Sequence, residues 1–315
     1  MNNSPRHKTV MIKEASKYVN LENGDTFLDA TLGGGGHSKA ILDKYDAINV
    51  IGIDKDIQAI NIAQKNLKDY KNSISLHNID FSKIDEVVKK NQIKNIGAIL
   101  FDLGTSQIQL NDPKRGFSFQ HESPLDMRMD SRQNTTADDI INNFKESDII
   151  KILSDYGEER YSKTIARLII AKRPIKNTGE LSNLVLAAYK GKRNKKIHPA
   201  TKVFQALRIA VNDELKMLEI ALSKSIKLLK NPGGRLVVIS FHSIEDRIVK
   251  QFFRNESINC LCDPKIILCS CNHQAKIKLI SKKIIRPSEK EIEENPSSRS
   301  AKMRVAEVIK ARKAS

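Results

Sequence analysis

The stretch FLDATLGGGGHSKAIL, from Phe27 to Leu42, decides the fold of this chain together with VIGIDKD, from Val50 to Asp56. An apolar strand, four consecutive glycines, a helix and a second apolar strand follow one another, and Asp54 ends the second strand. Four glycines in a row lose much backbone entropy on folding and add no side-chain packing, so they suit a backbone that approaches a ligand closely. An acid at the end of the next strand can accept hydrogen bonds from ribose hydroxyls. The pattern therefore predicts a site for a nucleoside-containing cofactor.

The first third of the chain alternates strand and helix patterns. Strands are predicted at residues 26–30, 50–54, 74–78 and 96–102, and helices at 37–45, 57–71 and 81–91. This alternation is typical of a parallel sheet that is covered by helices on both faces and binds ligands at the carboxyl ends of its strands. The glycine loop, Asp54, Phe81 and Asp102 all follow predicted strand ends. We therefore expect them to form one site at this edge of the sheet.

The pattern beyond Asp102 is loop-like and then helical. Helices are predicted at residues 136–144, 147–156, 158–172 and 179–189, and one long helix follows His198, with an apolar stripe from Phe204 to Leu222 and an end near Asn231. Strand patterns resume at 235–241 and 303–309. Two late strands are too few for a separate sheet domain. The sequence thus predicts one α/β domain, residues 1–110 and 211–315, interrupted by a helical insert at 111–210.

The composition indicates a polyanionic partner. The 315 residues include 54 Lys and Arg against 37 Asp and Glu, a net charge of +17, which favours nucleic acid binding. Aromatic residues make up only 5%, without tryptophan, so a broad base-stacking platform is disfavoured. No apolar run is long enough to span a membrane, and the first residues lack an apolar signal region, so a cytoplasmic protein is expected.

All four cysteines lie in one short segment, as two C-x-C pairs: Cys260, Cys262, Cys269 and Cys271. A disulfide framework is not expected in a cytoplasmic protein. The clustering permits a four-thiolate zinc site, but the one-residue gaps are tighter than the usual gaps of two to four residues. The sequence therefore favours reduced thiols in a loop, predicts no metal, and leaves zinc as the alternative.

The details of the glycine loop discriminate between cofactors. Counted from Gly33 or Gly34, the third small residue of a dinucleotide fingerprint falls on Ser38 or Lys39, which disfavours NAD. The phosphate-loop pattern of ATP-binding proteins is absent, so ATP is disfavoured too. Asp29, at the start of the loop, would repel a pyrophosphate and suits a ligand with an ammonium or sulfonium group. S-adenosylmethionine fits these requirements.

If the ligand is S-adenosylmethionine, a role can be predicted for the residues at each strand end. Amides of Gly34, Gly35 and Gly36 are expected to meet the methionine carboxylate as an anion-binding nest. Asp54 is expected to bind the ribose, and Phe81 to lie against the adenine. Each of these residues is thus a predicted cofactor contact.

Asp102, in FDLGTS, ends the fourth predicted strand beside this cofactor. A carboxylate there can simply cap the following loop. Alternatively, it can bind the methyl acceptor: a nucleobase amine is a weak nucleophile, and a carboxylate that accepts its hydrogen bond localises the lone pair and aims it at the methyl group. No cysteine lies near these strand ends, which argues against a covalent adduct at C6 of the base. Asp102 is therefore the predicted catalytic residue.

These motifs resemble the ribosomal RNA small subunit methyltransferase H family (RsmH, also called MraW) over essentially the whole chain. The matching blocks include DATLGGGGHS, IGIDKD, DLGTSQIQL from Asp102, HPATKVFQALRIAVNDEL from His198 and GGRLVVISFHSIEDRIVK from Gly233. The resemblance implies a class I S-adenosylmethionine-dependent methyltransferase (Rossmann-like) α/β domain with an inserted helical domain. It also implies N4-methylation of a cytidine in the decoding region of small-subunit (16S) ribosomal RNA, so the expected partner is this RNA or the assembling small subunit.

The resemblance further implies which residues contact the ligands. The cofactor contacts would be Gly35, Gly36, His37, Asp54, Phe81, Asp102 and Gln109. The usual family pattern after Asp102 has a proline at the position of Ile108, and its loss is expected to loosen the loop with Gln109. Basic residues in matched blocks are candidate RNA contacts: Arg115, Arg128, Lys202, Arg208 and Arg247. Lys202 stands where an arginine is usual, which keeps the charge but loses the bidentate fork.

Several alternatives remain open at this level. His242 is either a core or a helix-capping residue. A non-catalytic RNA-binding factor would lack cofactor affinity, and a DNA amino-methyltransferase would commonly have a proline-proline-aromatic loop where this chain has Leu103-Gly104-Thr105. The oligomeric state is undefined, a homodimer being one option.

Overall fold

The computed structural model describes residues 9–120, 122–189, 198–263, 265, 268 and 270–310. The chain divides into two compact units. The first, Met1–Gly104 with Lys216–Ser315, contains a β-sheet and is called the sheet unit; the second, Thr105–Leu215, is called the helical unit. The sequence predicts the changes between them at 110/111 and 210/211, whereas the units meet at 104/105 and 215/216.

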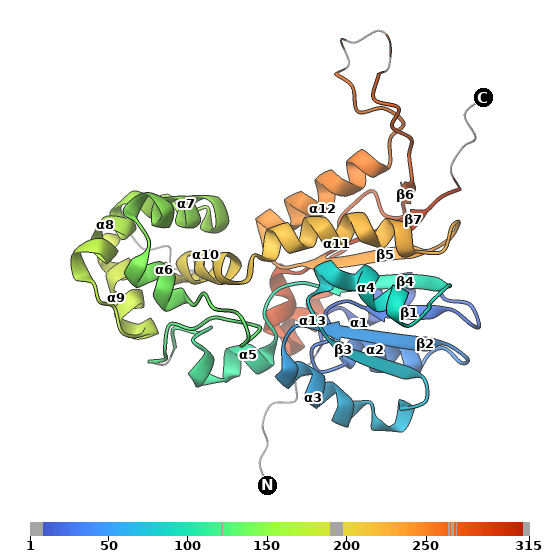
Figure 1. Ribbon diagram of the computed structural model, residues 1–315, viewed down its shortest axis with the longest axis horizontal. Coiled ribbons are helices and arrows are strands. Elements are labelled where there is room, and N and C mark those ends of the chain that lie inside the picture. Colours follow the sequence, from blue (N-terminus) through green and yellow to red (C-terminus); the bar gives the residue numbers. More distant parts are fainter. Residues whose placement is uncertain are drawn as a thin grey trace. The chain divides into compact units, whose positions relative to one another are not determined.

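Within the described residues, the sheet unit has one seven-stranded sheet (Figure 1). In spatial order the strands are β3 (Ile74–Asn78), β2 (Asn49–Asp54), β1 (Thr26–Asp29), β4 (Ile96–Asp102), β5 (Arg235–Ser240), β7 (Lys302–Val308) and β6 (Ile277–Leu279). Strands β1 to β5 are parallel, and β7 is antiparallel to both of its neighbours. The strand order reverses between β1 and β4, and ligands of open α/β sheets bind at such switch points.

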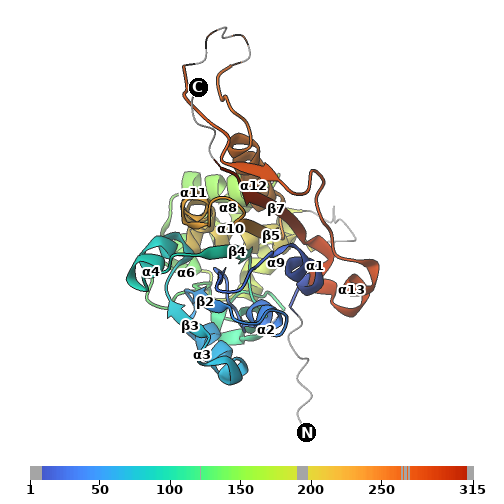
Figure 2. The same cartoon turned by 90° about the vertical axis from the view of Figure 1, so that its right-hand side faces the viewer.

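Helices cover both faces of this sheet, as Figure 2 shows edge-on. They are α1 (Ile12–Tyr18), α2 (Gly36–Leu42), α3 (Ile57–Asn66), α4 (Ile84–Lys90), α11 (Glu214–Leu228), α12 (Ser243–Glu256) and α13 (Glu289–Glu294), with short 3-10 helices at Lys68–Tyr70, Phe81–Lys83 and Pro296–Ser300. Because side chains alternate along a strand, Leu28 and Phe101 pack toward α4, α11 and α12, whereas Phe27 and Leu100 pack toward α1 and α2. The sheet is therefore buried on both sides, which explains its continuous apolar strands.

The helical unit has a hydrophobic core of its own. Its helices are α5 (Gln107–Asn111), α6 (Ala137–Asn143), α7 (Glu146–Gly157), α8 (Ser162–Lys172), α9 (Thr178–Ala188) and α10 (Ala200–Asn212), with a 3-10 helix at Pro113–Arg115. Buried Leu153, Ile169 and Val185 belong to this core. The side chain of Asn212 is buried and holds the preceding loop: it accepts a hydrogen bond from Met129 N at 2.8 Å and donates one to Met127 O at 2.8 Å.

The prediction of one long helix after His198 is wrong. Helix α10 ends at Asn212 and α11 begins at Glu214, because Asp213 between them has a left-handed backbone (φ 51°, ψ 34°). Aspartate tolerates this conformation better than most residues. The apolar periodicity continues across the break since both helices bury a face, but in separate cores: Leu207 lies in that of the helical unit and Leu218 in that of the sheet unit.

Several other predicted helices are longer than the observed ones, and two of them differ most at one end. The helix predicted at 57–71 ends at Asn66 and is followed by a 3-10 turn. The helix predicted at 158–172 begins at Ser162, because Glu158 adopts a left-handed conformation (φ 47°) at the end of α7. In the described parts of the chain, none of the helices has the length and apolar character needed to cross a membrane.

Candidate active site

The glycine loop joins β1 to α2. Contacts within the protein, in addition to the predicted ligand, explain why glycines occupy it. Gly35 lies at φ +81°, which disfavours a side chain. A Cβ atom on Gly36 would lie 1.9 Å from Oγ1 of Thr9, so the N-terminal segment packs directly against this glycine. The carbonyl of Gly34 accepts a hydrogen bond from Nδ2 of Asn66 at 2.8 Å. The loop is thus fixed from two sides by the protein itself.

Asp54, at the end of β2, ties the glycine loop to the neighbouring strand. Its carboxylate accepts hydrogen bonds from Gly33 N and from Asp56 N, each at 2.9 Å. Burial raises the pKa of Asp54 to about 6, although these two amides act in the opposite direction. Each carboxylate oxygen has a second lone pair. Asp54 can therefore support the loop and still accept a hydrogen bond from a ribose hydroxyl, which remains a prediction.

Asp29 lies at the end of β1 and is fully buried. It accepts hydrogen bonds from Ser38 Oγ at 2.7 Å and from Thr31 N at 3.4 Å, and burial raises the pKa of its carboxyl group. Its oxygens are therefore engaged within the loop. Because burial favours the neutral form of this carboxyl group, the repulsion of a pyrophosphate by Asp29 remains a prediction.

His37 connects this buried acid with Asp102. Nε2 of His37 lies 3.5 Å from Oδ2 of Asp102, and the two side chains are 5% and 20% exposed. Burial alone would lower the pKa of His37, but the interaction with Asp102 and the charge of Asp29 outweigh it and raise this pKa above its usual value. A protonated His37 is therefore stabilised beside the carboxylate of Asp102.

The Asp102 carboxylate is held in place by the backbone of β4 and retains hydrogen-bonding capacity. Asp102 N donates a hydrogen bond to Thr31 Oγ1 at 2.6 Å, and the residue pairs with Ile239 of β5. Oδ1 of Asp102 is buried and has no hydrogen-bond partner among the described residues. An unsatisfied buried acceptor costs about 1–3 kcal/mol. Such an atom at the switch point fits a ligand that donates a hydrogen bond there.

Phe81 follows β3 and begins a 3-10 helix capped by Asp80, whose carboxylate accepts from Ser82 N at 2.8 Å. The Phe81 ring meets the ring of Phe101 edge to face, with centroids 5.7 Å apart. Phe81 is only partly buried. Its stacking on adenine remains a prediction.

The sheet unit thus brings the predicted strand-end residues to one edge of the sheet, whereas Gln109 belongs to the helical unit. Gln109 is buried in a capping box at the start of α5: its Oε1 accepts from Ser106 N at 3.1 Å, and Ser106 Oγ accepts from Gln109 N at 3.3 Å. This box fixes the turn that a proline at position 108 would otherwise restrict. The expected loosening of the loop remains a prediction.

Most of the candidate RNA-binding residues have partners within the protein. Arg128 donates through Nε and Nη2 to Asp126, at 2.8 Å each, and through Nη1 to two carbonyl groups. Arg208 forms a bidentate pair with Glu214 at 2.8 and 3.0 Å. Arg115 donates to the carbonyls of residues 128 and 129, and Lys202 to that of residue 158. These contacts are structural, and RNA contact by these residues remains a prediction.

Two basic side chains from matched blocks lie on or beside α12. Arg247 is exposed on this helix. His242 caps its first turn: the ring accepts a hydrogen bond from Glu245 N, and the Glu245 carboxylate accepts from His242 N. The capping interpretation of His242 is therefore confirmed.

The model of the MraW methylase family matches residues 4–309 of the chain. The chain belongs to this family. Relatives named ribosomal RNA small subunit methyltransferase H are 47% identical over 304 residues in Dehalococcoides mccartyi (96% of this chain, 86% of the relative) and 45% over 306 residues in Carboxydothermus hydrogenoformans (96% and 98%). A relative of the same name from Clostridium botulinum is 45% identical over 308 residues (96% and 99%).

Membership in the MraW family makes the chain an S-adenosylmethionine-dependent methyltransferase. The predicted family, fold class and cofactor are thereby confirmed. When bound, the cofactor supplies an electrophilic methyl group. The sequence did not indicate the role of Thr31, which holds the backbone of Asp102. Its only signal is its position, two residues after the acid that ends β1.

Proposed function

We propose that this MraW family member transfers the methyl group of S-adenosylmethionine to the N4 amine of a cytidine in the decoding region of small-subunit (16S) ribosomal RNA. Relatives that are 45–47% identical are named ribosomal RNA small subunit methyltransferase H, and the net charge of +17 suits an RNA partner. Such a substrate would place the protein in the cytoplasm, on the RNA or on the assembling small subunit.

The observation behind the catalytic part of this proposal is the unpartnered Oδ1 of Asp102. The cytidine amine would donate a hydrogen bond to this oxygen, which localises the nitrogen lone pair and orients it toward the methyl group. As the N–C bond forms, the amine becomes more acidic, and the same oxygen is placed to accept its proton. His37, whose pKa is raised by its interaction with Asp102 against the effect of burial, lies beside this carboxylate.

The remaining residues of the site would hold the cofactor. Amides of Gly34, Gly35 and Gly36 would face its carboxylate, Asp54 its ribose and Phe81 its adenine. The hydrogen bonds from Gly33 and Asp56 to Asp54 fix the acid that binds the ribose. The protein therefore contributes mainly positioning, which can account for a large share of the rate of a bimolecular transfer.

Nucleoside mass spectrometry of small-subunit RNA from a strain lacking the chain tests this function. We expect loss of N4-methylcytidine, its restoration by the wild-type gene, and no restoration by an Asp102→Ala gene expressed to the same level. Unchanged N4-methylation in the deletion strain would contradict the proposal. Methyl transfer to naked RNA compared with purified small subunits then defines the physical substrate.

A non-catalytic RNA-binding factor is tested separately. The structure provides the glycine loop, Asp54 and an unpartnered Asp102 oxygen at one edge of the sheet, which a mere binding protein would not require. Calorimetry should therefore detect S-adenosylmethionine binding to the purified chain. A chain that folds but has no affinity for this cofactor would favour the binding factor.

A further inference from the structure

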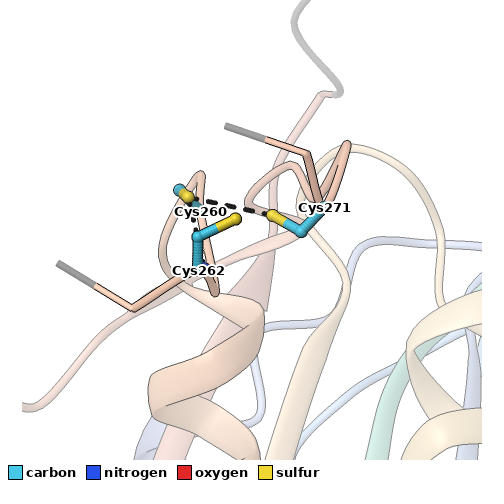
Figure 3. Close-up of side chains that lie close together, drawn as sticks. All are labelled: Cys260, Cys262 and Cys271. Carbon is cyan, nitrogen blue, oxygen red and sulfur yellow. Dashed lines mark hydrogen bonds between the residues drawn. The ribbon is translucent and has the colours of Figure 1, made fainter. Parts of the chain in front are cut away.

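Three cysteines of the sheet unit lie close together in space. Along the sequence they are far from the strand ends that are predicted to bind the cofactor. Cys260, Cys262 and Cys271 belong to the segment that links α12 to β6. Their sulfur atoms all lie within 4.8 Å of one another, and Figure 3 shows them converging from two sides of the loop. The fourth cysteine, Cys269, lies outside the described residues. The proposed methyl transfer does not require such a cluster.

The base of the linking segment explains how distant cysteines meet. Lys276 N donates to Glu256 O at 2.8 Å, and Nζ of Lys276 pairs with the carboxylate of the same glutamate at 2.8 Å. One step further, the ring of His273 contacts Asn255 O at 2.9 Å, and Ala275 N donates to Asn259 Oδ1 at 3.2 Å. These contacts join the two sides of the segment. The first C-x-C pair therefore faces Cys271 of the second.

The sulfur geometry matches a tetrahedral ion and not a disulfide. Sγ of Cys260 and Sγ of Cys271 are 3.8 Å apart. A disulfide bond requires about 2.05 Å. Zn–S bonds of about 2.3 Å at tetrahedral angles instead separate two sulfur ligands by about 3.8 Å. In the structure this contact is a hydrogen bond that Sγ of Cys271 donates to Sγ of Cys260, and its length also fits two thiolates that share a zinc ion.

Backbone amides point at the same sulfur atoms. Leu261 N donates to Sγ of Cys271 at 3.3 Å, and Cys262 N donates to Sγ of Cys260 at 3.4 Å. Hydrogen bonds to the charged form favour thiolates, which are the form that binds metal. Second-shell hydrogen bonds of this kind orient metal ligands. The loop therefore has both the ligand set and the groups that would hold it in place.

The segment also lacks another means of becoming ordered. Leu261 is 46% exposed and Leu268 82% exposed, so these two described apolar side chains do not belong to a local core. Structural zinc sites supply folding free energy to small elements without a core. A metal at the cysteines would close the loop above the contacts at its base.

We propose that Cys260, Cys262 and Cys271 bind one Zn²⁺ ion that closes the loop between α12 and β6. Soft thiolate ligands select zinc over magnesium, calcium or manganese. Three protein sulfurs leave one position of the tetrahedron for another ligand. The sequence favoured reduced thiols because each one-residue gap is tight, whereas the structure brings sulfur atoms together from both sides of the loop. The role is structural and does not depend on which RNA the enzyme methylates.

Metal analysis of the full-length chain, produced in zinc-supplemented medium and dialysed against a mild chelator, tests this site. We expect about one zinc per wild-type chain and at least tenfold less in Cys260→Ser/Cys271→Ser. Lys265→Ala, in the same exposed loop, is the matched control and should retain the ion. Wild-type protein without zinc, or equal zinc in the cysteine variant, would overturn the proposal.

Two further measurements keep the test independent of folding and of the methylation proposal. Titrating wild-type protein with a mercurial thiol reagent should release zinc in step with thiol modification, and zinc that is not released would exclude thiolate ligands. The affinity of Cys260→Ser/Cys271→Ser for S-adenosylmethionine should stay within about twofold of wild type, which shows that the sheet unit is folded. Recovery of a Cys260–Cys271 disulfide from freshly purified protein under reducing conditions would also refute the site.

Discussion

The substitution Asp102→Asn gives the sharpest test of the proposed chemistry, because it removes a charge while preserving the shape of the side chain. Little in the fold depends on that charge. Oδ1 has no hydrogen-bond partner in the described residues, and the bond from Asp102 N to Thr31 Oγ1 does not involve the side chain of residue 102. The main loss is the attraction to His37 at 3.5 Å, which we expect to lower the free energy of unfolding by about 1 kcal/mol.

The expected loss of activity is much larger than the loss of stability. A hydrogen bond to a charged acceptor contributes about 1.5–3 kcal/mol and one to a neutral acceptor about 0.5–1.5 kcal/mol, so orientation of the amine alone accounts for about a tenfold decrease. The amide of asparagine also cannot accept the proton that leaves the amine, and loss of a general base decreases rates by about 10²- to 10⁴-fold. We therefore expect the single-turnover rate of Asp102→Asn to fall at least a hundredfold.

The assay follows transfer of a labelled methyl group to small subunits purified from a strain that lacks the chain, at saturating cofactor. Calorimetry measures S-adenosylmethionine affinity separately, so that a binding defect is not mistaken for a chemical one. Asp43→Asn is the matched control, because its carboxylate pairs with Lys39 at 3.2 Å at the end of α2 that is remote from the glycine loop, and it should leave the rate unchanged. A rate for Asp102→Asn within threefold of wild type would refute the role given to Asp102.

Three further outcomes follow from the described contacts. Affinity for S-adenosylmethionine should fall about tenfold from pH 7 to pH 5, since Asp54, with its pKa raised to about 6, becomes protonated in the free protein. Calorimetry on Asp54→Asn should show an affinity that does not change with pH. A wild-type affinity that is independent of pH would contradict this prediction. Gly36→Ala should lower the free energy of unfolding by about 1–3 kcal/mol through its clash with Thr9, and adding Thr9→Ala should restore part of it; a stable single variant would argue against the packing. Asn212→Ala should lower the free energy of unfolding, measured with urea, by about 3 kcal/mol, because two backbone groups lose their buried partner. Asn143→Ala, at an exposed position, should change this free energy little.

The sheet was predictable because burial on both faces leaves a strong local signal. The six predicted strands agree with β1 to β5 and β7 to within one residue at each end. Strand β6 was not predicted, because the alternation of Ile277, Lys278 and Leu279 covers only three residues and is too short to distinguish a strand from a loop. Its pairing with β7 is set by the tertiary structure.

The break at Asp213 shows where periodicity stops being informative. An apolar stripe records that a face is buried but not which core buries it. Leu207 and Leu218 keep helical spacing although they belong to different hydrophobic cores. A left-handed aspartate between them interrupts the helix without disturbing that pattern. Only knowledge of the two cores identifies the boundary.

The sequence also does not indicate whether a charged side chain has a partner within the protein. From the sequence, Arg128 and Arg208 are candidate RNA contacts. In the structure, their side chains donate hydrogen bonds to Asp126, Glu214 or backbone carbonyls. Whether an arginine has an internal partner depends on tertiary distances that spacing does not encode. A basic residue in a matched block is therefore a weak indication of RNA contact by itself.

The same reasoning strengthens the assignment of Asp102. Asp29 and Asp54 have hydrogen bonds to Ser38 and to loop amides, so the fold gives sufficient reason for both acids. The fold does not explain why Oδ1 of Asp102, whose carboxylate lies beside His37, is buried without a hydrogen-bond partner among the described residues. Because leaving such an atom unsatisfied costs free energy, its retention requires a gain elsewhere. Binding of the methyl acceptor provides that gain, and it does so at the sheet edge where the cofactor loop is placed.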